Sequence, residues 1–427
     1  MFLFRLLLCA AVLMLTPTAQ AYSVLTHEAI IDSAWEGEIA PLLKKRFPQA
    51  TPDDLLHAHA YAYAGAIIQD MGYYPFGSHF FSDLTHYVRS GDFVVSMIAE
   101  SQDLNEYAFA LGSLAHYASD TTGHPVAVNP SVAIEFPKLR QKFGRIVTYA
   151  DNPAAHLKVE FGFDVWQVAR GHYAPQSYHD FIGFEVSKPV LERAFQQTYS
   201  LKLADQFTSF DLALGTYRYS VATLIPEMTR VAWDLKKDEL EKSQPGMTRR
   251  KFRYNLSRAS YHKEWDRQYQ RPGIFARILA FFFHLIPKIG PFKAAAFQPP
   301  TSATITLFED SFNRTIDEYR GLLRQVGAGQ LTLPNRDFDT GQPTRPGEYR
   351  LADDAFSKLA IEIAGKDPKD ADPKVVKVVL DFYQDLNLPF ATKSDPMKWD
   401  ETIKALARLR DGAATAEGLP AEKNERR

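Results

Sequence analysis

The sequence predicts an all-α fold, a multi-helix bundle with an additional helical C-terminal region, and three observations support this. Apolar residues recur at intervals of three and four through most of the chain, which is the period of an amphipathic helix. Several of these stretches begin with a polar capping residue followed by proline. Runs of alternating apolar and polar residues joined by Asn-Gly turns are missing from the sequence, so β-hairpins are not expected.

The first expected helix spans 51–70. Thr51 is a suitable N-cap, Pro52 occupies the first helical position, and Asp54 stands three residues after the cap, which is the pattern of a capping box. Asp70 falls at the end of this stretch, just before a glycine. A carboxylate at a helix C-terminus faces the negative end of the helix dipole, and a nearby cation would reverse this penalty.

Two further helices follow at 104–120 and 151–169. In the first, small and apolar residues share one face at spacings of four and three, which predicts a stripe that faces the core. The second begins with Asn152 as a cap and Pro153 at the first helical position.

Composition is ordinary for a globular protein. The chain has 427 residues, of which 45% are hydrophobic and 23% charged, and its formal net charge is -2. No overall basic charge argues for duplex nucleic acid as a partner. The only cysteine, Cys9, lies in the leader described next, so a disulfide is not expected in the exported chain.

Residues 1–21 are expected to be a secretory signal peptide. They contain the basic Arg5, an apolar run over 6–15 and a small-x-small ending at 19–21. Cleavage after Ala21 would make Tyr22 the first residue of a periplasmic or secreted protein.

The remainder divides into a first domain at 22–240, a polar, basic linker at 241–255, a helical C-terminal region at 256–412 and a disordered tail at 413–427. A second stretch rich in Gly and Pro, 327–349, also has the composition of a linker. Segment 273–292 is strongly apolar but contains Arg277, His284 and Lys288. It is expected to be a buried helix or a peripheral membrane contact.

Histidines concentrate in the first part of the chain, where ten of the twelve precede residue 180. Within the expected helices, two histidines are followed four residues later by a carboxylate, in the pairs His116 with Asp120 and His156 with Glu160. On a helix this spacing places both side chains on one face, and such pairs build metal sites inside helical bundles. With His124 close by, the two pairs together predict a metal site.

The expected mature N-terminus adds another chelating group. The free amine of Tyr22, with a pKa of about 8, and its carbonyl oxygen can hold a metal ion in a five-membered ring. His27 lies five residues further on. This ligand exists only if the leader is removed after Ala21.

The order of these residues resembles that of the zinc-dependent phospholipase C family and, more distantly, of the zinc-dependent single-strand nucleases. The resemblance covers about residues 22 to 185 and implies a helical bundle around a trinuclear zinc cluster. The metal ligands that it implies are Tyr22, His27, Asp70, His86, His116, Asp120, His124, His156 and Glu160.

Three positions depart from the family pattern or leave a choice. The family begins its mature chain with Trp where this sequence has Tyr22, which changes the side chain but not the chelating backbone. Both His79 and His86 precede an aromatic residue, and the family's spacing after Asp70 favours His86. His124 follows Asp120 by 4 residues, where the family usually has 6, which leaves its role open.

Nitrogen and oxygen ligands without a thiolate suit zinc. The resemblance implies that Asp120 bridges two of three zinc ions, and that metal-bound hydroxide, available near neutral pH, attacks a phosphodiester in line. Three zinc ions bring six positive charges and Asp70, Asp120 and Glu160 bring three negative ones, so an anionic substrate is favoured. Asp70 is also the candidate catalytic base or orienting residue.

The expected function is therefore an exported, zinc-dependent, phospholipase C-like hydrolase of phospholipid head-group phosphodiesters. A single-strand nuclease with the same site is an alternative, and would need aromatic and basic side chains along its groove. A catalytically inactive, metal-stabilised binding protein is a third. The C-terminal region could cover the site, contact a membrane or bind a partner.

Overall fold

The computed structural model describes residues 24–170, 184–221, 298–366 and 371–416. Within these ranges the regular elements are helices, and the only pairing of extended backbone is an isolated bridge between Arg336 and Pro343. The predicted all-α fold is therefore confirmed.

The helices up to residue 221 are α2 (Val24–Ala34), α3 (Ala40–Arg46), α4 (Pro52–Gly65), α5 (His79–Tyr87), α6 (Ser90–Ala99), α7 (Leu104–Gly123), α8 (Asn129–Glu135), α9 (Pro137–Phe143), α10 (Pro153–Arg170), α12 (Lys188–Tyr199) and α13 (Phe210–Tyr219). Short 3-10 or π-helical turns are η1 (Trp35–Ile39), η2 (Ile68–Tyr73), η3 (His124–Val128) and η4 (Ala204–Gln206). The later part contributes α18 (Ser302–Ala328), α19 (Arg350–Ala364), α20 (Pro373–Phe382), η7 (Ala391–Ser394) and α21 (Pro396–Ala416).

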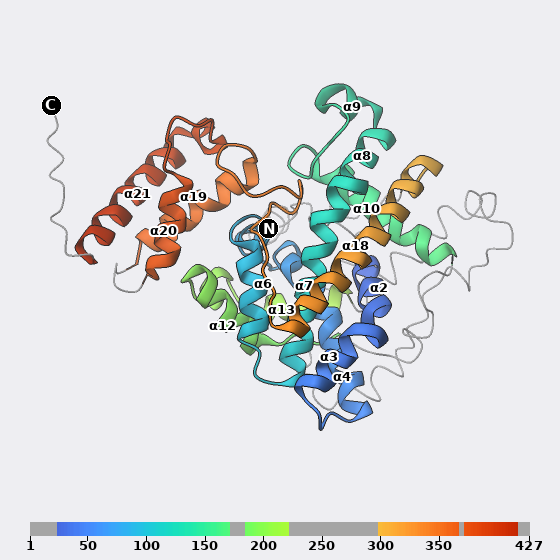
Figure 1. Ribbon diagram of the computed structural model, residues 1–427. Helices are drawn as coiled ribbons and strands as arrows, with labels where there is room; N and C mark the ends of the chain where they lie inside the picture. Colours follow the sequence, from blue (N-terminus) through green and yellow to red (C-terminus); the bar gives the residue numbers. More distant parts are fainter. Residues whose placement is uncertain (1–23, 171–183, 222–297, 367–370, 417–427) are drawn as a thin grey trace, which may run out of the picture.

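Helix α7 is the centre of the bundle (Figure 1). All of its residues from Glu106 to Gly123 are buried, because α2, α4, α6 and α18 pack around it. A helix enclosed in this way places its polar residues in a medium of low dielectric, where they need partners. His116 and Asp120 are two of these polar residues.

Two glycines allow α4 and α7 to approach closely. A Cβ atom at Gly65 would collide with the carbonyl group of Phe109 in α7, and one at Gly112 would collide with that of Ala62 in α4. Each helix thus presents a glycine to the backbone of the other. The same close approach brings the carbonyl oxygen of Ala66 to 2.9 Å from Nδ1 of His116.

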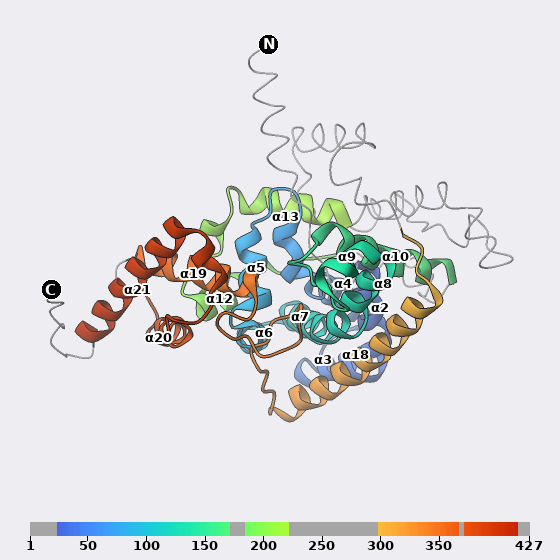
Figure 2. The same cartoon turned by 90° about the horizontal axis from the view of Figure 1, so that it is seen from above.

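The chain beyond residue 300 packs on the first part in two places. Helix α18 lies along α7, and the hydroxyl of Tyr319 donates to the carbonyl oxygen of Leu111. Helices α19, α20 and α21 group together at one side of the bundle, and α19 contacts α5 (Figures 1 and 2). The described part of the expected C-terminal region therefore forms helices, joined between α18 and α19 by an irregular segment.

The expected helix starts agree with the structure. Thr51 and Asp54 form a complete capping box at α4, and Asn152 accepts a hydrogen bond from the backbone of Ala155 at the start of α10. The end of the first helix differs from the expectation, because α4 ends at Gly65 and Asp70 lies in the separate turn η2. The hydroxyl of Ser82 holds this turn by accepting from the amide of Gly72 and donating to the carbonyl of Gln69.

Several expectations concern residues outside the described ranges. These are the leader at 1–21, Tyr22, the linker at 241–255, the apolar segment at 273–292 and all of the expected tail beyond Ala416, where α21 ends. Among the described residues, no helix combines the length and the apolar character that crossing a bilayer requires.

The α4–α7 contact gives a test of the fold. Gly112→Ala should lower the free energy of unfolding by about 2–3 kcal/mol, because the added methyl group must push the two backbones apart. Urea denaturation followed by circular dichroism measures this change. Gly215→Ala in α13 is the matched control, since its added Cβ meets no atom within 4 Å, and alanine is the better helix former. Equal stability of the two variants would contradict the proposed tight contact.

Candidate metal centre

Six elements bring the expected ligands together. His27 comes from α2, Asp70 from η2, His86 from α5, His116 and Asp120 from α7, His124 from η3, and His156 and Glu160 from α10. All of these side chains are buried. They form three groups in which the potential ligand atoms lie within 4.8 Å of one another.

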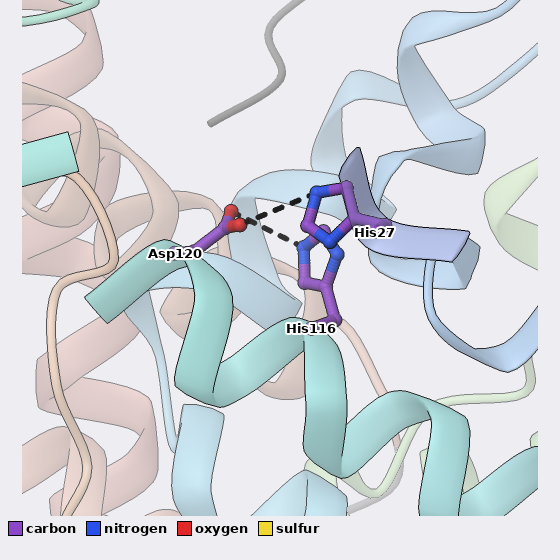
Figure 3. A group of neighbouring side chains, drawn as sticks. All are labelled: His27, His116 and Asp120. Atoms are coloured by element: carbon purple, nitrogen blue, oxygen red, sulfur yellow. Dashed lines mark ion pairs between the residues drawn. The ribbon is translucent and has the colours of Figure 1, made fainter. Parts of the chain in front are cut away.

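The first group joins His27, His116 and Asp120 (Figure 3). Nε2 of His27 lies 3.6 Å from Oδ1 of Asp120, and Nε2 of His116 lies 3.2 Å from Oδ2. The two imidazole rings stack with centroids 4.7 Å apart. One face of α7 therefore presents an imidazole and a carboxylate to the imidazole from α2.

The second group joins Asp70, His86 and His116. Nε2 of His86 lies 3.3 Å from Oδ1 of Asp70, 3.3 Å from Nε2 of His116 and 3.6 Å from Oδ2 of Asp120. The two oxygens of Asp120 thus face different histidines, with Oδ1 toward His27 and Oδ2 toward His86 and His116. This is the arrangement of a carboxylate able to bridge two metal ions.

The third group joins His124, His156 and Glu160. Nδ1 of His156 lies 2.8 Å from Oε1 of Glu160, one helical turn further along α10. His124 begins the π-helical turn η3, directly after α7 ends at Gly123. The short sequence spacing between Asp120 and His124 is thus compatible with a place for His124 in this group.

Three of the histidines have a ring nitrogen occupied by a neutral acceptor. Nδ1 of His86 faces the carbonyl oxygen of Ser82 at 2.8 Å, Nδ1 of His116 faces that of Ala66, and Nε2 of His156 lies 2.7 Å from Oδ1 of Asn129. The remaining nitrogen of each ring is directed at the carboxylates. Metal-binding histidines usually show this division, in which an outer acceptor fixes the tautomer and the ring orientation.

Burial disfavours the charged form of each candidate ligand, and neighbouring charges decide in which direction its pKa finally moves. It lowers the pKa of His27 to about 3, with repulsion from His116 in the same direction, so this imidazole is neutral at pH 7. For His86, burial also opposes the charge, but the neighbouring Asp120 and Asp70 outweigh it and raise its pKa to about 10. Burial, with repulsion from Asp70 and Asp120, raises the pKa of Glu160 well above its usual range.

Unsatisfied oxygens point to a cation. Five buried carboxylate oxygens have no hydrogen-bond partner among the described residues. They are both oxygens of Asp70, both oxygens of Asp120, and Oε2 of Glu160. Asp70 and Asp120 are paired with imidazole nitrogens at 3.2 to 3.6 Å, and a bound cation would supply the closer contacts that buried carboxylates normally have. The donor set of imidazoles and carboxylates therefore fits zinc ions held between these groups.

The structure separates the two candidates that follow Asp70. His86 lies in the cluster, whereas His79 begins α5, is exposed, and belongs to none of the three groups. Tyr22 falls just before the described residues. The start of α2 nevertheless has a fixed place, since both oxygens of Asp164 accept hydrogen bonds from the amides of Leu25 and Thr26.

Sequence reasoning missed three residues beside the candidate ligands. Asp164 extends the series of His156 and Glu160 by another four residues on α10, so its spacing was a usable signal. Asn129, beside His156, and Asp339, whose Oδ1 lies 2.5 Å from Nδ1 of His124, had no such signal. Asp339 lies in the segment that composition predicted to be a linker.

The geometry defines a class of protein: an all-helical bundle with a buried centre of histidines and carboxylates that could bind metal. Residues 26–208 match the model of a family described as zinc dependent phospholipase C. This part of the chain is therefore similar to the zinc-dependent phospholipase C family, as the resemblance predicted. All described candidate ligands lie in this range. No curated protein and no solved structure matches the chain.

Zinc binding at neutral pH should release protons. In the metal-free protein His86 holds a proton at pH 7, because its pKa is raised to about 10, and the raised pKa of Glu160 favours its protonated form as well. Ligands must lose these protons, so zinc affinity should rise with pH between 7 and about 10. Calorimetric titration in buffers of different ionisation enthalpy counts the protons released.

The variant His86→Gln should release fewer protons than the wild-type protein, and His79→Gln should behave like wild type. Zinc binding with no proton release at pH 7 would contradict the prediction.

Proposed function

We propose that the protein is a zinc-dependent phosphodiesterase that hydrolyses the head-group phosphodiester of phospholipids. The observation that carries this proposal is the convergence of three histidine-carboxylate groups within the part of the chain that matches the model of the zinc-dependent phospholipase C family. A buried centre of this kind is more than a structural zinc site needs, since a structural site is closed by four ligands around one ion.

Up to three zinc ions would be held by these groups. His27 and one oxygen of Asp120 would hold one ion, and Asp70, His86 and His116 with the other oxygen of Asp120 would hold its neighbour. The third would be held by His124, His156 and Glu160. Zinc ions there would supply Lewis acidity, polarising a phosphoryl oxygen and acidifying water.

Asp70 is the proposed catalytic residue. Both of its oxygens lack hydrogen-bond partners among the described residues, and burial raises its pKa. A carboxylate in this position is suited to act as a base or to orient the attacking water. Its place in η2, tied to α5 through Ser82, holds it in one position relative to His86.

The proposed partner is a phospholipid surface, with the 273–292 segment as a possible peripheral contact. This segment lies outside the described residues, and its apolar sequence with interspersed basic residues is what supports the idea. Duplex nucleic acid is not proposed, because the formal net charge is -2. Single-stranded DNA is kept as a second substrate in the test below.

Export through a cleaved leader is also proposed, to the periplasm or the medium. The leader-like composition of residues 1–21 supports it. The position of the start of α2 also supports this proposal, because Asp164 holds Leu25 and Thr26 by hydrogen bonds to their amides, next to His27 in the sequence. A chain beginning at Tyr22 would therefore start three residues before this anchor.

Activity can be tested with two substrates side by side. The zinc-loaded wild-type protein should hydrolyse phosphatidylcholine vesicles faster than single-stranded DNA. His116→Ala should reduce this activity by more than about 100-fold, because it removes a candidate ligand that belongs to two of the three histidine-carboxylate groups. The control His79→Ala should retain activity.

Faster cleavage of single-stranded DNA would contradict the proposed phospholipase activity and indicate a nuclease. Bound zinc with no turnover of either substrate would leave a metal-stabilised binding protein. Absence of bound zinc in the wild-type protein would refute the proposed function.

The exported chain should begin at Tyr22. N-terminal sequencing identifies the first residue, and zinc counting by mass spectrometry on the same sample should give three ions per chain. A variant that keeps one extra residue before Tyr22 should bind one ion less tightly, because the backbone amine is displaced. A natural start at another residue would exclude Tyr22 as a ligand.

A further inference from the structure

The irregular segment 334–349, between α18 and α19, forms one wall of the metal centre. Its fixed position comes from contacts with α5, α6 and α7. Tyr117 donates to the carbonyl of Pro334, Ser90 donates to that of Arg336, and the amide of Phe338 donates to the carbonyl of His86. These are hydrogen bonds to backbone groups, so the path of the segment is fixed independently of most of its side chains.

Phe338 and Asp339 then reach the candidate ligands. The buried Phe338 ring packs against the rings of His86 and His116, with centroids 5.1 and 5.9 Å away. The buried Asp339 carboxylate places Oδ1 2.5 Å from Nδ1 of His124. A segment remote from the ligands in sequence therefore contacts three of them.

The Asp339 carboxylate is itself held in place. Its Oδ2 accepts hydrogen bonds from the hydroxyls of Tyr349 and Tyr87, and its backbone amide donates to Oδ1 of Asp337. Asn129 links the same residue to the next ligand, because its amide group donates to the carbonyl of Asp339 while its Oδ1 faces His156. With Oδ2 occupied in this way, Oδ1 is left for His124.

His124 needs such a partner. His86, His116 and His156 each have one ring nitrogen occupied by a neutral acceptor and the other directed at the group. For His124 neither ring nitrogen makes a regular hydrogen bond with the described residues, and the ion-pair contact of the Asp339 carboxylate, at 2.5 Å, is made to Nδ1. A carboxylate in this position holds the proton on Nδ1, leaves Nε2 for the metal and increases the basicity of the ring.

We propose that Asp339 is a positioning residue for the metal held by His124, His156 and Glu160, so that the C-terminal region completes this metal site. The proposal rests on the zinc-binding function proposed above. It adds to the family-matched range a residue more than a hundred positions beyond its end at residue 208.

Metal affinity tests the proposal without an activity assay. Asp339→Asn keeps the size of the side chain and removes its charge. It should weaken the binding of one zinc ion per chain by about 10–100-fold and leave the other ions in place. Titration with a chelator, followed by mass-spectrometric zinc counting, measures this. The visible spectrum of the Co²⁺-substituted protein should change for one ion only.

Controls separate this role from a general loss of structure. Glu348→Gln makes the same chemical change at an exposed residue of the segment and should bind zinc as wild type does. Asp339→Glu should recover part of the affinity. The rise in melting temperature on adding zinc should shrink in Asp339→Asn, whatever the melting temperature of its metal-free form.

A measurement on the zinc-loaded wild-type protein covers the case in which the variant does not fold. Long-range ¹⁵N NMR of the histidine rings should show His124 protonated on Nδ1 and metal-bound through Nε2. Binding through Nδ1, or unchanged zinc affinity in a folded Asp339→Asn, would overturn the inference and leave the proposed function intact. Absence of zinc from the wild-type protein would instead refute the proposed function.

Discussion

The burial of Asp120 is the constraint on which the rest of the structure depends. This carboxylate sits near the end of α7, on a helix whose sides are covered by other helices, and neither of its oxygens accepts a hydrogen bond from the described residues. Burial opposes its charge, but His116 and His86 hold the pKa of Asp120 well below its usual range. A buried anion is tolerated only with a compensating positive charge, and metal ions supply more of it than histidines alone.

The close packing of α4 on α7 serves the same centre. The glycines at the crossing bring the two backbones together, and the carbonyl of Ala66 then reaches His116. This carbonyl decides which nitrogen of His116 faces Asp120. The close contact between α4 and α7 therefore determines both the packing of the core and the orientation of the His116 ring, and a change that separates these helices would alter both.

Much of the fold and most of the centre could be predicted from the sequence, for reasons that differ between residues. The helix starts at Thr51 and Asn152 were readable because capping is local. The pairs on α7 and α10 were readable because the helical period fixes which residues share a face. The end of α4 was not, because a tertiary contact through Ser82 forms the η2 turn that carries Asp70. Asp339 could not be found either, since it meets His124 only through long-range packing of an irregular segment.

The composition of 327–349 suggested a linker because Gly, Pro and polar residues are typical both of flexible connections and of irregular segments with fixed structure. What distinguishes the two is whether backbone groups have partners in the rest of the molecule. Here the carbonyl groups of Pro334 and Arg336 and the amide of Phe338 all bond to helices of the first part. Because α18 also lies along α7, the chain beyond residue 300 contributes to the core as well as to the site. Both parts of the described chain therefore build the candidate metal centre, and the range that matches the family contains the candidate ligands but not every residue that contacts them.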